Sequence, residues 1–199
     1  MARGARGGAV LARADGAVLE TFIEDEILVQ KPDLRHPQLR WVDRRQDLEG
    51  IGRWIGERVS LDTRYISHGE IQQSLSLDGK QWAPNAVELI ARECAAIADN
   101  PGVSLAAAYD GAGALQGAAI AVWELEAPTP HVVLADLVVD PHARSGGVGR
   151  ALVAFVEDEA RARGVGWAFL ESGLGNERAH HFFEREGFAV VSKVFAKRL

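Results

Sequence analysis

The sequence predicts an α/β domain built around a central mixed sheet that is mostly antiparallel. Two apolar runs, 103–109 and 115–125, flank the turn-forming segment from Asp110 to Gly113, a pattern typical of an antiparallel hairpin. A third apolar run, 131–139, leads through a glycine-bearing turn into a helical pattern. Strand patterns and helical patterns alternate over most of the chain, so we expect helices to cover the sheet.

The first 37 residues differ in composition from the rest of the chain. Residues 1–16 are largely Ala, Arg and Gly with little to bury, and we expect them to form a flexible arm. Residues 17–37 contain an apolar and acidic stretch whose alternation is imperfect, so a strand and a short helix both remain open. We interpret this N-terminal extension as an added strand or a contact in a homodimer.

The main domain is expected to cover residues 38–199. Residues 39–42 are a short strand candidate, and Asp43 is a candidate cap for a helix that continues to about Val59. Apolar residues recur along this helix at spacings of three and four, so one face is expected to point into the core.

A polar stretch over residues 60–82 shows no clean period, and a helix is then expected from Pro84 to about Ala98. Asn100 and Pro101 end this helix. Cys94 lies on its apolar side, where a lone cysteine is usually a small buried side chain.

The last third of the chain carries the remaining elements. The helix after the glycine-bearing turn is expected to end at Gly164, and residues 165–170 form the next strand. Asn176 is positioned to cap a further helix, which Gly187 closes. Residues 188–195 are expected to complete the sheet.

The junction between strand and helix near residue 144 has the composition of an anion-binding turn. A helix that begins at a tight turn directs free N–H groups and its positive dipole end at one small volume. Arg144, Gly147 and Gly149 have the spacing R-x-x-G-x-G, without the Gly-Lys-Ser/Thr of a P-loop or a third glycine at dinucleotide spacing. The junction therefore predicts a phosphate site, although a plain connection with glycines for packing also fits these six positions.

This spacing resembles the pyrophosphate-binding motif of the GNAT superfamily, the acyl-CoA-dependent N-acyltransferases. A downstream segment is similar to the second GNAT signature, Asn-x-x-Ala-x-x-Phe/Leu-Tyr-x-x-x-Gly-Phe, and only the tyrosine is missing. The matching residues are Asn176, Ala179, Phe182, Gly187 and Phe188. The resemblance covers about residues 38–199 and implies a GNAT fold, with splayed fourth and fifth strands and helices on both faces of the sheet.

The resemblance also implies that acetyl-CoA is the acyl donor. Backbone amides of residues 145–150, together with Arg144, would hold its pyrophosphate, and its pantetheine chain would pair like an added strand with residues 137–139. An amide there would stabilise the carbonyl oxyanion. Asn176 and Phe183 would contact pantetheine as well. The expected cofactor-binding residues are Leu137, Val138, Val139, Arg144, Ser145, Gly146, Gly147, Val148, Gly149, Arg150, Asn176 and Phe183.

Acyl transfer to an amine requires a proton acceptor, because a lysine-like amine with a pKa of ~10.4 is mostly protonated at neutral pH. Asp136 is the leading candidate because it directly precedes the thioester-binding stretch, although it could equally orient a neighbouring group. Glu171 is the second candidate. Phe183 replaces the tyrosine that often protonates the leaving thiolate in this family, so His180 or His181 would deliver that proton, unless these are only polar groups on a helix surface.

In GNAT proteins the region corresponding to residues 60–82 helps to form the acceptor side of the cleft. Tyr65, His68 and Glu70 are therefore candidate substrate contacts, and a solvated loop or helix end explains them equally well.

We therefore expect an N-acetyltransferase that moves an acetyl group from acetyl-CoA to a primary amine by direct attack in a ternary complex, without a metal. The acceptor would be a small molecule or a peptide. A non-catalytic acyl-CoA-binding or sensing module is the alternative, suggested by Phe183 and the polar stretch at 60–82.

Composition narrows the expected partners and location. The formal net charge of −6 argues against nucleic acid and anionic lipid as partners, and no apolar run approaches the length of a membrane span. A single cysteine and the lack of a secretory pattern lead us to expect a cytoplasmic location.

Overall fold

The computed structural model describes residues 37–199. The arm predicted over residues 1–16 lies outside the described residues. So does the extension predicted over 17–37, apart from Pro37. Both remain predictions.

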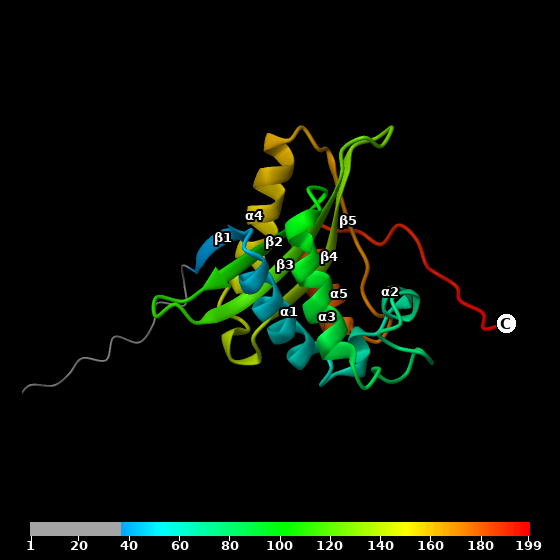
Figure 1. Ribbon diagram of the computed structural model, residues 1–199. Coiled ribbons are helices and arrows are strands. Elements are labelled where there is room, and N and C mark those ends of the chain that lie inside the picture. Colours follow the sequence, from blue (N-terminus) through cyan, green and yellow to red (C-terminus); the bar gives the residue numbers. More distant parts are fainter. Residues whose placement is uncertain (1–36) are drawn as a thin grey trace, which may run out of the picture. The chain divides into compact units, whose positions relative to one another are not determined.

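A single five-stranded sheet forms the centre of the described domain, with its strands in chain order (Figure 1). The strands are β1 (Gln38–Val42), β2 (Val103–Tyr109), β3 (Leu115–Glu124), β4 (His131–Val139) and β5 (Trp167–Leu170). The first four are antiparallel neighbours, and β5 pairs with β4 in parallel. The mixed, mostly antiparallel sheet is therefore confirmed.

The helices follow the expected order, with one addition in the polar stretch 60–82, for which the sequence predicted no helix. They are α1 (Arg45–Val59), α2 (His68–Gln72), α3 (Ala86–Ala96), α4 (Val148–Ala162) and α5 (Glu177–Arg185), with short 3-10 turns η1 (Thr63–Tyr65), η2 (Ile97–Asp99) and η3 (Pro141–Ala143). Among the described residues, none of these helices has the length and apolar character needed to span a bilayer.

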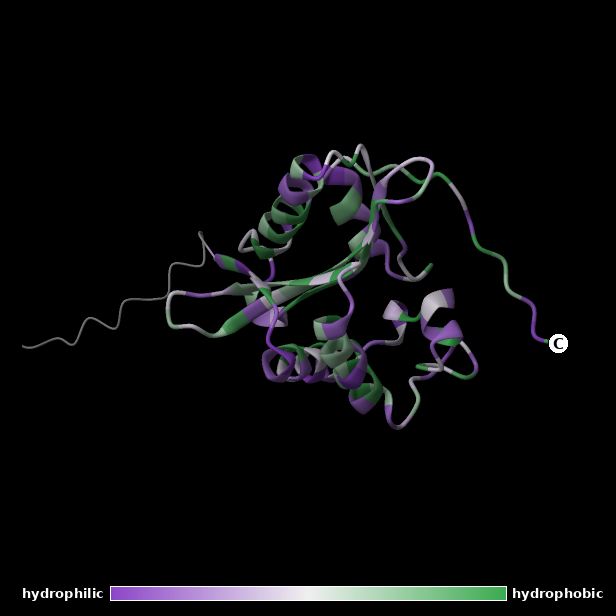
Figure 2. Cartoon of the chain, turned by 45° about the horizontal axis from the view of Figure 1, so that its top comes forward, coloured by the Kyte–Doolittle hydropathy of each residue, from purple (hydrophilic) through white to green (hydrophobic). Residues whose placement is uncertain are grey.

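Two hydrophobic cores lie on opposite faces of the sheet, and the turned view in Figure 2 shows helices on both of these faces. Along β2, Leu105 and Ala107 pack with α1 and α3, whereas Ala106 and Ala108 pack with α4. This alternation follows from the two-residue period of a strand. Helices on both faces are thus confirmed.

Close packing of α1 against α3 depends on Gly52. A side-chain carbon at this position would lie 2.6 Å from Cβ of Cys94, closer than packed atoms can approach. Cys94 is 2% exposed, and burial raises the pKa of its thiol to about 12. It therefore serves as a small core residue, as the sequence predicted.

The strands β4 and β5 separate part-way along their length. Their pairing ends at Leu134 and Leu170, so residues 135–139 of β4 have no partner in β5. A register shift opposite Ile120 leaves Ala135 as an extra residue in β4, which is a β-bulge. The expected splay between the fourth and fifth strands is confirmed.

Two local predictions are wrong. Asp43 is not the cap of α1, because the capping position is Arg44 and carries no side-chain capping bond. Residues 188–195 form no strand. Their alternating apolar pattern favours an extended backbone, but a strand also needs an edge in register, and propensity does not specify one.

Candidate active site

A cleft of about 890 Å³ opens where β4 leaves β5. Its lining comes from β4, the turn that follows it, the first turn of α4, the loop after β5, and helices α2, α3 and α5. Segments far apart in the sequence thus meet around one volume, large enough for an extended ligand.

The turn between β4 and α4 forms one wall of this cleft. Gly147 has φ +85° at the N-terminal cap of α4, and a side-chain carbon there would meet no atom within 4 Å. Ser145 also has a positive φ of 66°, which is uncommon for a residue other than glycine. Such backbone strain is typical of functional turns.

Backbone donors at the start of α4 are available to a ligand. The N–H groups of residues 147–150 donate to no backbone carbonyl in the part of the chain that the structure describes. No acidic side chain lies in the first turn of the helix. Free donors and the positive end of the helix dipole therefore meet at the cleft, which favours a bound anion.

Arg58 and Tyr65, from other elements, contact side chains of this turn. Arg58 on α1 donates from Nε and Nη2 to Oδ2 of Asp140, at 3.0 and 2.8 Å. Desolvation opposes the charge on Asp140, but hydrogen bonds from the His142 N–H and from Arg58 bring its pKa below its ordinary value. Arg144 points across the cleft, with Nη2 3.4 Å from the Tyr65 hydroxyl.

Asp136 lies directly after the bulge in β4. It retains some exposed surface within the cleft, although protein atoms surround it. Burial, followed by the negative charges of Glu70 and Glu93, raises the pKa of Asp136 to about 7. A carboxyl with this pKa exchanges a proton readily at neutral pH, as general acid–base catalysis requires.

A pair formed by a histidine and a glutamate crosses the cleft. Glu171, the residue after β5, places Oε2 3.0 Å from Nδ1 of His68 at the start of α2. Glu70 lies on the same helix, and one of its carboxylate oxygens is already hydrogen-bonded. It accepts the Ser67 N–H at 2.6 Å in a capping box.

Known proteins share this architecture. The model of the acetyltransferase (GNAT) family matches residues 69–188. The chain belongs to the GNAT acetyltransferase family.

Two curated relatives match shorter regions of the chain. The uncharacterized N-acetyltransferase YhdJ of Bacillus subtilis is 40% identical over 68 residues, which is 34% of this chain and 48% of that protein. The IAA acetyltransferase of Azospirillum brasilense is 40% identical over 53 residues, 27% of this chain and 35% of that protein. The matched regions therefore span less than half of either relative.

Solved structures share the fold at low sequence identity. A tetramutant of BH1408 from Bacillus halodurans has a TM-score of 0.62 at 19% identity, covering 81% of this chain and 99% of that one. The aminoglycoside N-acetyltransferase AAC(6')-Iy, in complex with CoA, has a TM-score of 0.60 at 17% identity, covering 87% and 99%. These similarities establish the GNAT fold.

Most residues that the GNAT resemblance assigned to the cofactor line the cleft. Gly146 is the exception. Asn176 lies in the cleft wall and caps α5, because its Oδ1 accepts the Ala179 N–H at 3.4 Å. Phe183 also lines the cleft and packs edge-on against Phe182 and Phe188.

The predicted catalytic residues separate into two groups. Asp136 and Glu171 line the cleft, whereas His180 and His181 do not. The Nε2 atom of His180 lies 3.1 Å from the Gly173 carbonyl oxygen. His181 is exposed, and its Nδ1 lies 3.5 Å from Glu184.

Sequence reasoning missed two contributors to the cleft. Glu93, on α3, was not considered, yet its charge helps to raise the pKa of Asp136. Arg58 was missed as the partner of Asp140. Only the packing of α1 and α3 against the sheet brings these side chains to β4, so no local motif could have identified them.

Proposed function

We propose that this protein is an N-acetyltransferase that transfers the acetyl group of acetyl-CoA to a primary amine within a ternary complex. One observation carries the proposal. A carboxyl whose pKa is about 7, Asp136, lines the same cleft as the free N–H groups that begin α4. One cleft thus combines an anion-binding turn with a proton acceptor.

Acetyl-CoA would bind along the turn and the free part of β4. The N–H groups of Ser145 and of residues 147–150, together with the guanidinium of Arg144, suit its pyrophosphate, whereas the Gly146 N–H already donates to the Ala143 carbonyl. Residues 137–139 have no partner in β5, so their backbone is available to pair with the amide groups of pantetheine. Asn176 and Phe183 would contact pantetheine from the other wall.

Asp136 would act as the general base. The amine nitrogen forms a bond to the acetyl carbonyl carbon, the C–S bond breaks, and Asp136 accepts the proton that the nitrogen loses. An N–H of residues 137–139 would stabilise the oxyanion. Glu171, with His68 beside it, is the alternative proton acceptor.

The thiolate would leave without a tyrosine in the usual position. A thiol with a pKa of ~8.5 lies about 1.5 pH units above neutrality, which corresponds to ~2 kcal/mol. Because this free energy is small, water or the proton held by Asp136 can protonate the leaving thiolate. His180 is a weaker candidate, because its Nε2 lies beside the Gly173 carbonyl oxygen.

Acidic side chains in the cleft support a cationic acceptor. Glu70, Glu93 and Glu171 line the same cleft as Asp136. Their charges attract an ammonium group before it loses its proton. We therefore propose a primary amine on a small molecule or a peptide as the acceptor.

The alternative is an acyl-CoA-binding or sensing module, which the missing tyrosine hydroxyl at Phe183 favours. Thiol release from acetyl-CoA across a panel of amines separates the two functions. Turnover that falls in the Asp136→Asn variant supports the enzyme. Tight binding of CoA in calorimetry, with no turnover on any amine, supports the sensor.

A cytoplasmic location and a homodimer complete the proposal. Fractionation of cells that express the tagged protein tests the location.

A further inference from the structure

The outer edge of β5 is open in the described domain. β5 pairs with β4 on one side only and stands last in the sheet. Trp167 and Phe169 lie on this strand with stacked rings, 6.0 Å between centroids, and are 59% and 39% exposed. An exposed apolar edge of this kind offers free N–H and C=O groups for pairing with another strand.

The C-terminal segment 189–199, here called the tail, has the complementary character. Its backbone is extended but belongs to no strand, and Figure 1 shows it leading away from the sheet. It is rich in β-branched and aromatic residues, which favour a strand. Its large apolar side chains are Val190, Val191, Val194, Phe195 and Leu199, and all of them are exposed.

The tail and the edge meet at one point. Val191 and the two rings of β5 line a shallow apolar hollow beside His131 and Pro128. Beyond this hollow the tail leads away from the sheet (Figure 1), and residues 192–199 pair with none of the strands that the structure describes.

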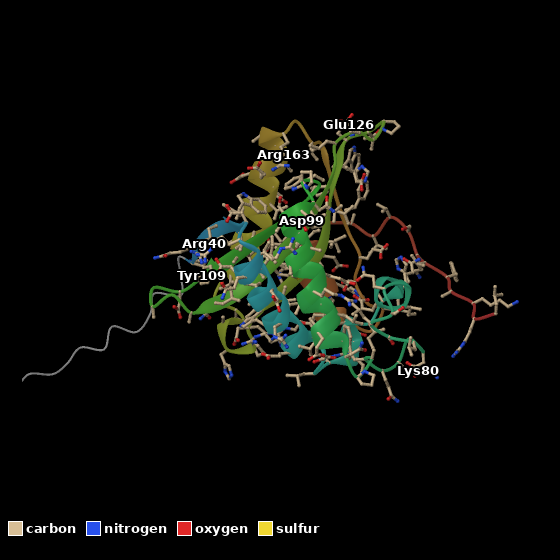
Figure 3. All side chains as sticks on the ribbon, in the orientation of Figure 1. Arg40, Lys80, Asp99, Tyr109, Glu126 and Arg163 are labelled. Atoms are coloured by element: carbon tan, nitrogen blue, oxygen red, sulfur yellow. The ribbon has the colours of Figure 1, made fainter. Side chains whose placement is uncertain are left out.

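The charges of the two surfaces are complementary. The tail carries Lys193, Lys197 and Arg198 and no acidic residue. Glu124 and Glu126 are exposed at the connection between β3 and β4, where Figure 3 labels Glu126. Trp167 pairs with His131 at this same end of the sheet. A strand running antiparallel to β5 would therefore bring its last cations towards these carboxylates.

We propose that the protein forms a two-fold homodimer in which the tail of each copy adds as an antiparallel strand to β5 of the other copy. An open edge and a projecting strand-forming segment on one chain are self-complementary, as a two-fold interface requires. The exchange covers the rings of β5 and buries the apolar side chains of the tail. It places the dimer contact at β5 and the tail, and it does not depend on the proposed acetyl transfer.

Light scattering during size-exclusion chromatography tests the dimer. The unaltered chain is expected at twice its 21.5 kDa mass. Phe195→Asp and Trp167→Asp are each expected to give a monomer that still binds CoA. The matched control, Leu77→Asp, changes a residue that is 72% exposed on another surface and should leave the dimer intact. A monomer at all concentrations, or a dimer that persists in both variants, overturns the proposal.

Cysteine pairing identifies whose tail occupies the edge. In a Cys94→Ala background, one protein carries Trp167→Cys and another carries Val194→Cys or Phe195→Cys. Successive residues of a strand point to opposite faces, so one of these two tail positions lies on the same face as residue 167. Oxidation of the mixed proteins should give a reducible dimer that neither protein gives alone. A third protein carries both cysteines in one chain. An internal disulfide in that protein, or no cross-link with either tail position, overturns the exchange.

Discussion

The Asp136→Asn variant is expected to be more stable than the unaltered chain near pH 8 and to acetylate amines more slowly. A merely structural aspartate predicts the opposite change in stability, because its replacement would remove a favourable contact. This pairing of effects separates a proton acceptor from a residue that holds the fold.

The sign follows from the pKa of Asp136. In the folded chain this pKa is about 7, against an ordinary value of 3.8. Between these values the folded chain keeps a proton that the unfolded chain has lost. The contribution of this group therefore favours folding increasingly as the pH falls from ~8 to ~4. Above pH ~7 the enclosed carboxylate destabilises the fold.

The magnitude follows from the same values. A gap of about 3 pH units at ~1.4 kcal/mol per unit sets an upper limit of ~4 kcal/mol, and water in the cleft reduces it to roughly 1–3 kcal/mol. Asparagine carries no charge, so the variant should recover this free energy at pH ~8 and lose the advantage at pH ~4. Loss of a general base should lower kcat/KM by about 10²–10⁴-fold.

Two assays measure these effects. Thermal denaturation at several pH values compares the free energies of unfolding, with Glu49→Gln as a control at an exposed position outside the cleft. Kinetics on the unaltered enzyme should show kcat/KM falling about tenfold from pH ~8 to pH ~6, since the base is mostly protonated at the lower value. An Asp136→Asn variant that is less stable at pH ~8, or equally active, would refute this reasoning.

Three further substitutions test the cleft. Gly147→Ala places a side chain at φ +85° and should cost about 1–2 kcal/mol of stability while weakening CoA binding, measured by denaturation and calorimetry. Arg58→Ala removes the partner of Asp140 and should raise the KM for acetyl-CoA more than the KM for the amine. Arg161→Ala, which breaks two surface ion pairs within α4, should change neither KM. Phe183→Tyr restores a hydroxyl to the cleft wall and should raise kcat by at most ~30-fold, the equivalent of ~2 kcal/mol. A loss of activity would show that the ring of Phe183 serves only to pack against its neighbours.

Local patterns in the sequence were sufficient for much of the fold. The hairpin around Asp110, the strand and turn before α4, and the Asn176 cap each depend on residues close together in the chain. Turn chemistry and capping act over a few positions, so they can be recognised without tertiary information. The two GNAT motifs then identified the family, which the family match over residues 69–188 confirms.

Features that depend on packing could not be predicted. The pKa of Asp136 depends on its enclosure and on Glu70 and Glu93, which other elements bring to β4. The direction of His180 towards the Gly173 carbonyl depends on where the loop after β5 passes. Residues 188–195 have a strand-like pattern but form no strand, because the pattern does not supply an edge in register.

The central claim is that backbone N–H groups of the turn before α4 hold the pyrophosphate of CoA, so that its thioester lies beside Asp136. Amide chemical shifts, recorded by NMR while CoA is titrated into the protein, test it most directly. We predict that the largest changes occur at residues 145–150 and at 137–139, and that they are reduced in the Arg144→Ala variant. Saturable binding that leaves these amides unchanged, or no binding to the folded chain, would contradict the account.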